Sequence, residues 1–155
     1  MTSNEIRRIA VIGTGTVGAS WAAFFLSRGL TVAASDPATQ AEDFLRRFVA
    51  AAWPALVRVG GSGSIPEAVP DHRLSFHPEP EAAVAEAEFV QENAPEREAL
   101  KRQLLRRIDA IAHPSAIFAL SSSGLLMTRS ATRLPPSPTV RDRTPIQPAS
   151  SRAAR

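Results

Sequence analysis

Short apolar runs alternate along the chain with longer amphipathic stretches, and this alternation predicts the secondary structure. Runs rich in apolar and β-branched residues predict strands at residues 7–13, 30–36, 73–77, 89–93 and 115–123. Apolar residues at helical spacing predict helices at residues 13–29, 38–58, 78–88 and 95–112. Strands that alternate with helices imply a parallel sheet with right-handed crossovers, so we expect an α/β fold, a Rossmann-like doubly wound sheet.

Apolar stripes mark the helix faces that we expect to be buried. Along the second helix, apolar side chains recur from Phe44 to Val57 and form one continuous stripe. Trp21 and Trp53 lie at core spacing on the first and second helices. We therefore expect both tryptophans to pack inside the protein.

Composition divides the chain near residue 128. Residues 1–128 hold 12 Lys and Arg against 14 Asp and Glu, whereas residues 129–155 hold six Arg, one Asp and five Pro. The net charge of +3 therefore arises in the second segment. We predict one folded domain over residues 1–128 and a disordered Pro/Arg-rich tail over residues 129–155. The tail has no aromatic residue to stack on bases, so nucleic acid is not an expected partner.

Several protein classes are excluded by what the sequence lacks. No apolar run approaches the roughly 18 residues that span a membrane, and "MTSNEIRR" lacks the order of a signal peptide. We therefore expect a cytoplasmic protein with no membrane partner. The absence of cysteine excludes disulfides, thiolate metal ligands and thiol nucleophiles, and no metal site is expected.

A glycine loop between the first strand and the first helix is the most informative motif. It has the G-x-G-x-x-G pattern, opens a helix, and precedes the acidic Asp36 at the end of the next strand. In dinucleotide-binding folds the three glycines permit a tight turn, a close approach to pyrophosphate, and close helix packing. Free N–H groups at the helix start then hold the anion. The candidate residues are Gly13, Thr14, Gly15, Thr16, Val17 and Gly18.

Asp36 favours NAD over NADP as the dinucleotide. A carboxylate at this position accepts hydrogen bonds from a ribose 2′-OH. At about 4 Å and an effective dielectric constant of about 20, it would repel a 2′-phosphate by roughly 4 kcal/mol per pair of unit charges. No Arg or Lys follows directly, because the next residues are Pro37 and Ala38. A Rossmann-like sheet could also bind FAD, or no nucleotide at all.

Polar residues follow the fourth and fifth predicted strands. Glu92 and Asn93 end the fourth strand, and the serine run that includes Ser123 ends the fifth. Ligands of open α/β sheets bind outside the carboxyl ends of the strands, so these residues, the glycine loop and Asp36 would line one rim. Alternatively, Glu92 and Asn93 cap the helix that Pro95 opens, and the serines cap the next helix.

Together these segments resemble the NAD-binding domain of the L-3-hydroxyacyl-CoA dehydrogenase family. The matching segments, in order, are "VIGTGTVGASWAAFF", "DP", "FVQENAPEREALK" and "IFALSSSGLL", within residues 6–128. The Glu-Asn-x-Pro-Glu form and the doubled leucine most resemble the L-carnitine dehydrogenase and lambda-crystallin-like branch.

The resemblance implies both a reaction and residue roles. The reaction is reversible hydride transfer between NAD and a 3-hydroxyacyl-CoA or a 3-hydroxy acid such as L-carnitine, in fatty-acid or carnitine metabolism. By position, residues 13–18 would hold the pyrophosphate, Asp36 the adenosine ribose, and Glu92 would lie near the nicotinamide ribose. Arg97 stands where the family has a basic cofactor contact, usually lysine. Ser123 matches a serine that hydrogen-bonds substrate and nicotinamide.

The resemblance also implies parts that we do not find in this sequence. The family's catalytic histidine lies in a sixth strand downstream of the serines, and a helical domain that helps to form the dimer follows it. His72, His77 and His113 stand elsewhere, and we expect them to be structural or surface residues. Without the base we expect little activity, because a positioned base contributes about 10²–10⁴ in rate.

The pattern of the family ends near Thr128, which suggests a change of reading frame and C-terminal truncation. We therefore consider three hypotheses. The first is a family oxidoreductase. The second is a non-catalytic NAD-binding fragment, either a product of gene truncation or a subunit that a separate chain completes. The third is a regulatory NAD sensor whose basic tail contacts a partner or nucleic acid.

Overall fold

The computed structural model describes residues 5–60 and 64–121. The elements, in chain order, are β1 (Arg8–Ile12), α1 (Thr16–Ser27), β2 (Thr31–Ser35), α2 (Ala41–Gly60), a 3₁₀ turn (Asp71–Arg73), β3 (Leu74–His77), α3 (Pro80–Val84), β4 (Phe89–Glu92), α4 (Glu98–Asp109) and β5 (Ile117–Leu120). The predicted tail at 129–155, the boundary at 128 and Ser123 lie outside the described residues.

The strands form one parallel sheet in the order β3-β2-β1-β4-β5. The chain runs outward from β1 through β2 to β3, then crosses back to β4 on the other side of β1. This order confirms the predicted doubly wound α/β fold. It also creates a switch point between β1 and β4, where ligands bind in such sheets.

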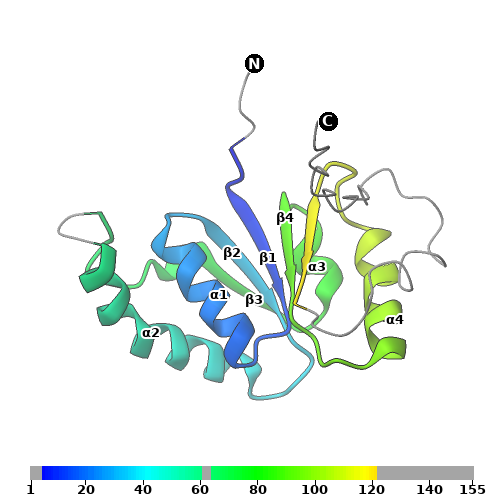
Figure 1. Ribbon diagram of the computed structural model, residues 1–155, viewed down its shortest axis with the longest axis horizontal. Coiled ribbons are helices and arrows are strands. Elements are labelled where there is room, and N and C mark those ends of the chain that lie inside the picture. The colour runs from blue at the N-terminus through cyan, green and yellow to red at the C-terminus, as the bar shows by residue number, and fades with distance from the viewer. Residues whose placement is uncertain (1–4, 61–63, 122–155) are drawn as a thin grey trace, which may run out of the picture.

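Helices cover the sheet on both sides, α1 and α2 on one and α3 and α4 on the other (Figure 1). Alternate residues of β1 point to opposite faces, because the side chains of a strand alternate. Ile9 and Val11 join the core under α1 and α2, whereas Ala10 and Ile12 join the core under α3 and α4. The first apolar run therefore forms the predicted strand, and its side chains are buried on both faces of the sheet.

Local chemistry explains where the helices begin and end. Gly29, with φ +78°, follows the last turn of α1, and its N–H donates to the Leu26 carbonyl at 2.9 Å. This is a common glycine ending of a helix. Glu42 and Asp43 occupy the first turn of α2 and Arg58 the last, which suits the helix dipole. Helix α3 is shorter than predicted, because the chain turns after Val84 to enter β4.

The prediction that both tryptophans are buried is wrong for Trp21. Trp53 is 2% exposed and donates its indole N–H to the Pro66 carbonyl at 2.9 Å, whereas Trp21 is 38% exposed. Helix α1 packs on the sheet through its small side chains, among them Ala19 and Ala22. Trp21 lies on the opposite side of α1 with Val17 and Phe24.

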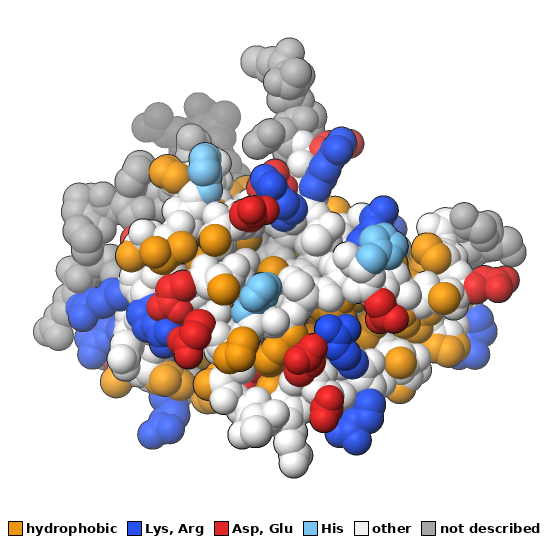
Figure 2. Space-filling view, turned by 180° about the vertical axis from the view of Figure 1, so that it is seen from behind, with side chains coloured by type: hydrophobic (Ala, Val, Ile, Leu, Met, Phe, Trp, Pro, Cys, Tyr) orange, Lys and Arg blue, Asp and Glu red, His pale blue; other side chains and the backbone are white. Residues whose placement is uncertain are grey.

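The reverse side of the molecule carries acidic and basic side chains interspersed with hydrophobic ones (Figure 2). One ion-pair group joins α4 to α3: Arg107 contacts Glu79 at 2.7 Å and Glu81 at 2.6 Å. The hydrogen bond from Arg107 lowers the pKa of Glu81, and the two carboxylates raise the pKa of Arg107. None of the described helices is long and apolar enough to cross a membrane.

Candidate functional site

The glycine loop leaves β1 in a conformation that requires glycine. Gly13 has φ +84°, and its N–H donates to the Ser35 carbonyl at 2.8 Å. A β-carbon on Gly13 would lie 2.9–3.0 Å from backbone atoms of Asn93 and Ala94. The loop is therefore pressed against the turn that follows β4, at the predicted switch point.

The other two glycines of the motif differ in what surrounds them. A β-carbon on Gly18 would lie 1.8 Å from the Gly13 carbonyl oxygen, so α1 can approach the loop this closely only through a glycine. A β-carbon on Gly15 would have no described heavy atom within 4 Å. Gly15 thus leaves open space at the start of α1, as expected where a ligand approaches the backbone.

The amino end of α1 has the features of an anion site. Gly15 is the N-cap residue, with extended backbone (φ −63°, ψ −169°) and no side-chain capping bond. Its carbonyl accepts the first helical bond, from Ala19 at 2.8 Å, and the first turn holds no acidic residue. The first amide N–H groups of a helix have no partner within the helix. These N–H groups can therefore donate to a pyrophosphate, and the positive end of the helix dipole also attracts the anion.

Asp36 joins the end of β2 to the glycine loop. Its Oδ2 accepts the Thr14 N–H at 2.9 Å, and its Oδ1 accepts the Ala38 N–H at 2.9 Å. Each carboxylate oxygen has a second lone pair, so Asp36 retains capacity to accept ribose hydroxyls. The loop and the predicted ribose-binding carboxylate are thus held in direct contact.

Thr14 supplies a second sign of a ligand site. It is 1% exposed, and its hydroxyl oxygen has no hydrogen-bond partner among the described residues. An unpaired buried hydroxyl costs about 1–3 kcal/mol, which a bound ligand or water would relieve. Together with the open space at Gly15, this hydroxyl fits a loop built around a dinucleotide.

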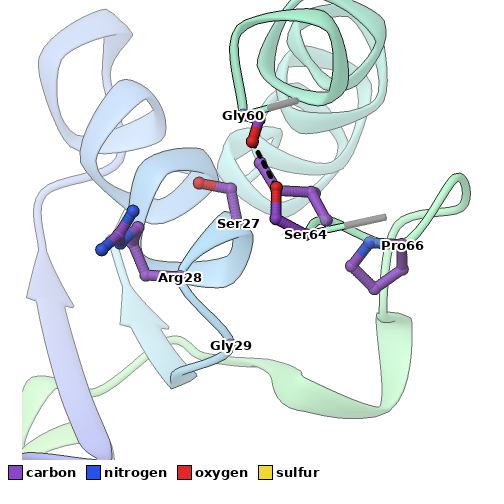
Figure 3. A pocket seen from close by; sticks show the side chains of 7 residues that line it. Ser27, Arg28, Gly29, Gly60, Ser64 and Pro66 are labelled. Carbon is purple, nitrogen blue, oxygen red and sulfur yellow. Dashed lines mark hydrogen bonds between the residues drawn. The ribbon is translucent and has the colours of Figure 1, made fainter. Parts of the chain in front are cut away.

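Two candidates of the loop remain: Thr16 is the exposed first residue of α1, and Val17 has an exposed side chain on the same helix. Val17 lines an apolar hollow with Ser20, Trp21 and Phe24. A second hollow lies between the end of α1 and the segment after α2, where the Ser64 hydroxyl donates to the Gly60 carbonyl (Figure 3). This second hollow does not include any residue of the glycine loop.

Glu92 is held inside the protein by a lysine that the sequence reasoning missed. The carboxylate of Glu92 is 0% exposed and lies 3.1 Å from the Nζ of Lys101, which is 2% exposed. The other carboxylate oxygen accepts the Ala94 N–H at 2.5 Å. The sequence did hold a sign that Lys101 is buried, because it lies at helical spacing with Leu105 and Ile108, which are buried on α4.

A network of amide and hydroxyl groups joins the ends of β4 and β5. Gln91 donates to the Ser121 hydroxyl at 2.8 Å, and that hydroxyl donates to the side-chain oxygen of Asn93 at 2.7 Å. The Asn93 N–H donates to the Ile12 carbonyl at 2.7 Å, which ties the network to β1. Gln91 and Ser121 were not predicted as site residues, and the predicted Ser123 follows just beyond the described part.

The alternative that Glu92 and Asn93 cap the next helix is wrong. Helix α4 begins at Glu98, not at Pro95, and its N-cap residue Arg97 has no side-chain capping bond. Arg97 is exposed, and its side chain pairs with no described residue. It is therefore available to a ligand at this rim.

Two of the described histidines, His77 and His113, make side-chain hydrogen bonds only to nearby residues, and His72 is exposed. His77 contacts Ser75 at 3.2 Å, and His113 contacts Ser115 at 2.7 Å. Each partner is two residues away in the chain, as expected for structural or surface residues.

Comparison with known proteins identifies the class of site. A family model described as "3-hydroxyacyl-CoA dehydrogenase, NAD binding domain" matches residues 8–141. The chain belongs to the 3-hydroxyacyl-CoA dehydrogenase family. It carries the family's NAD-binding domain, which confirms NAD as the cofactor expected from the glycine loop and Asp36.

Relatives with curated descriptions are called L-carnitine dehydrogenase. The protein from Streptomyces coelicolor is 50% identical over 129 residues, which are 83% of this chain and 39% of the relative. The protein from Burkholderia mallei is 53% identical over 124 residues, which are 80% of this chain and 37% of the relative. The chain thus spans less than two fifths of the length of these relatives.

A solved structure confirms the fold. The 3-hydroxybutyryl-CoA dehydrogenase of Escherichia coli K12 superposes with a TM-score of 0.72 and is 25% identical. The match covers 84% of this chain and 28% of that chain.

Proposed function

We propose that this chain supplies the NAD-binding half of an enzyme that transfers hydride between NAD and the 3-hydroxy group of a small substrate. The observation that carries the proposal is the contact of the glycine loop with two rim segments. Thr14 binds Asp36 at the end of β2, and Gly13 abuts Asn93 at the end of β4. One extended ligand that lies across the loop would touch both.

The strand order supports an orientation for the dinucleotide. The pyrophosphate lies on residues 13–18 and the adenosine ribose on Asp36, on the β2 side of β1. The nicotinamide half then extends to the β4 side, toward Glu92 and the exposed Arg97. Arg97 contacts the cofactor through its positive charge, and Ser123 contacts the substrate.

L-Carnitine is the substrate that the comparisons favour. Relatives called L-carnitine dehydrogenase are about half identical to this chain, whereas the 3-hydroxybutyryl-CoA dehydrogenase shares 25% of residues. L-Carnitine and 3-hydroxyacyl-CoA both carry the hydroxyl that hydride transfer to NAD requires. A 3-hydroxyacyl-CoA is therefore the alternative substrate, and carnitine the one to test first.

The chain by itself binds NAD without efficient turnover in this proposal. Oxidation of an alcohol needs a base for the hydroxyl proton. His77 and His113 are engaged in local contacts with Ser75 and Ser115, and neither they nor His72 matches the position of the family's base. In this proposal the base and the rest of the substrate site come from residues other than these histidines.

Calorimetry and a turnover assay test the proposal. We expect NAD⁺ to bind and NADP⁺ to bind much more weakly, and D36A to lose most of the NAD⁺ affinity. D43A, on the exposed first turn of α2, is the matched control and should bind as the wild type does. Unchanged NAD⁺ affinity in D36A would contradict the assignment of Asp36 to the adenosine ribose. Rapid NADH formation with L-carnitine would contradict the expected lack of turnover.

A further inference from the structure

Helix α1 carries apolar side chains on its outer side as well as on the side that meets the sheet. No residue of this helix, Thr16–Ser27, is charged. Small residues such as Ala19 and Ala22 form its buried side, whereas the aromatic Trp21 and Phe24 are exposed. A helix that is apolar all round is normally buried all round. The outer side of α1 is therefore a contact surface that no described residue covers.

The outer residues of α1 have the spacing of a helix-packing stripe. They occupy positions i, i+3, i+4 and i+7 and line one hollow: Val17, Ser20, Trp21 and Phe24. The rings of Trp21 and Phe24 meet edge to face with centroids 6.0 Å apart, so they form two walls of the hollow. The hydroxyl of Ser20, the smallest of the four, turns back to the Thr16 carbonyl at 2.7 Å. A second helix can therefore approach α1 most closely at Ser20.

The neighbouring sheet face extends this stripe. Trp21 stacks on Phe25 with ring centroids 5.4 Å apart, and Phe25 meets Phe89 on β4 at 6.0 Å. Ile117 on β5 pairs with Phe89 and is 52% exposed. Helices α3 and α4 pack on the opposite face of the sheet, so no described helix covers Ile117 on this one. The apolar surface thus continues from α1 onto the sheet.

The lack of charge on the stripe narrows the class of partner. The stripe offers no basic side chain to nucleic acid or to an anionic lipid surface, and no carboxylate to a basic protein. A second copy of this chain presents the same uncharged aromatic stripe. Two such stripes can meet across a twofold axis, where each patch is its own complement, without repulsion between like charges.

We propose that two copies of this chain associate through the outer side of α1, with the two Ser20 positions near the twofold axis. In this arrangement the Trp21 and Phe24 rings of each copy pack into the hollow of the other. The inference goes beyond the proposed function, because no cofactor takes part in the contact.

The size of the stripe sets the strength of the contact. Trp21 is 38% exposed and Phe24 is 45% exposed. Since a fully buried aromatic side chain removes about 150–250 Å² from water, the four rings of two copies can still bury roughly 240–450 Å². Val17 and Ile117 add to this area, but the total stays below the roughly 1,200 Å² of a stable specific interface. We therefore expect a weak dimer that forms with rising concentration.

Sedimentation equilibrium of the intact chain tests the proposal. The apparent mass of the wild type should rise with concentration from 16.6 kDa toward twice that value. S20R places two like charges together at the centre of the contact, so it should weaken association at least about tenfold. The matched control is A51R, which adds the same charge at an exposed position of α2 and should associate as the wild type does.

Cysteine cross-linking tests which surfaces meet. The chain has no cysteine, so S20C introduces a single thiol. A disulfide requires two β-carbons about 3.5–4.5 Å apart, which two Ser20 positions near a twofold axis can reach. With oxidised glutathione as the oxidant, S20C should give a covalent dimer. A51C, with its thiol on the exposed side of α2, should give none.

A mass of 16.6 kDa at every concentration overturns the inference, whether another segment of the chain or a different protein covers the stripe. Association that is as strong in S20R as in the wild type also overturns it. If circular dichroism shows that S20R does not fold, the S20C result decides, and the absence of a covalent S20C dimer then overturns the inference.

Discussion

The carbonyl oxygen of Gly13 occupies the place that a β-carbon of Gly18 would need, 1.8 Å from it. The first turn of α1 is therefore packed against the loop that precedes it. This contact places the amino end of α1 over the open space at Gly15. The geometry of the cofactor site thus depends on the absence of a side chain at Gly18.

We predict that G18A destabilises the protein by about 1–3 kcal/mol, because α1 must move away from Gly13 to admit the methyl group. Cofactor affinity should fall with it, since the amino end of α1 moves. Urea denaturation and NADH titration measure the two effects. If G18A is as stable as the wild type, Gly18 does not pack against the Gly13 carbonyl as described.

G15A is the matched variant, with the opposite expected result. Its β-carbon has free space and its φ of −63° suits alanine, so the loss of stability should stay below about 1 kcal/mol. NADH affinity should nevertheless fall, because the methyl group would occupy the space proposed for the pyrophosphate. Unchanged affinity in G15A would place the ligand elsewhere.

Acid should weaken the contact between Glu88 and the start of β1. The Glu88 carboxylate accepts the N–H groups of Arg7 at 2.7 Å and Arg8 at 3.0 Å, and these bonds lower its pKa. A pKa that is lower in the folded state stabilises the protein above the unfolded value of about 4.5. This stabilisation is lost as the pH falls through the lower, folded-state pKa.

E88Q should therefore be less stable than the wild type at pH 7, and the difference should disappear in acid. Urea midpoints between pH 7 and 3 measure it. E86Q is the control, because among residues 5–60 and 64–121 Glu86 pairs only with the exposed Arg8 side chain, at 3.6 Å. Parallel pH curves for E88Q and the wild type would refute the prediction.

The two tryptophans should differ in fluorescence. W53F, which retains Trp21, should emit at longer wavelength and be quenched more readily by acrylamide, because Trp21 is 38% exposed. W21F, which retains the buried Trp53, should emit at shorter wavelength and resist quenching. Equal quenching of the two variants would contradict the burial difference.

The exposed side of α1 and the neighbouring sheet face should promote self-association. Phe24 on α1 and Ile117 on β5 are exposed. Ile117 pairs with Phe89, which packs in the core under α1, so it faces the same side of the sheet as α1. Contiguous exposed apolar surface favours association.

We expect F24S to reduce concentration-dependent light scattering. V59S is the control, because Val59 is an exposed apolar residue at the end of α2, away from this surface. If both variants scatter as the wild type does, this surface does not drive association.

The sequence by itself determined the α/β class, the strand and helix order, and the glycine loop with Asp36. These features follow from local rules: the periodicity of apolar residues, and a glycine pattern that follows a strand, opens a helix and precedes an acidic residue. The prediction for Trp21 was wrong because α1 has apolar residues on both sides. Only packing decided that its alanine face, rather than its aromatic face, meets the sheet.

The tertiary structure alone decided how the rim is held together. Glu92 and Lys101 are nine residues apart, and no spacing rule indicates that they pair inside the protein. Gly13 and Asn93 come into contact because β1 and β4 are neighbours, although β2 and β3 lie between them in sequence. Local sequence sets the conformation of each segment, but the contacts between distant segments depend on the register of the sheet and on which helix face is buried.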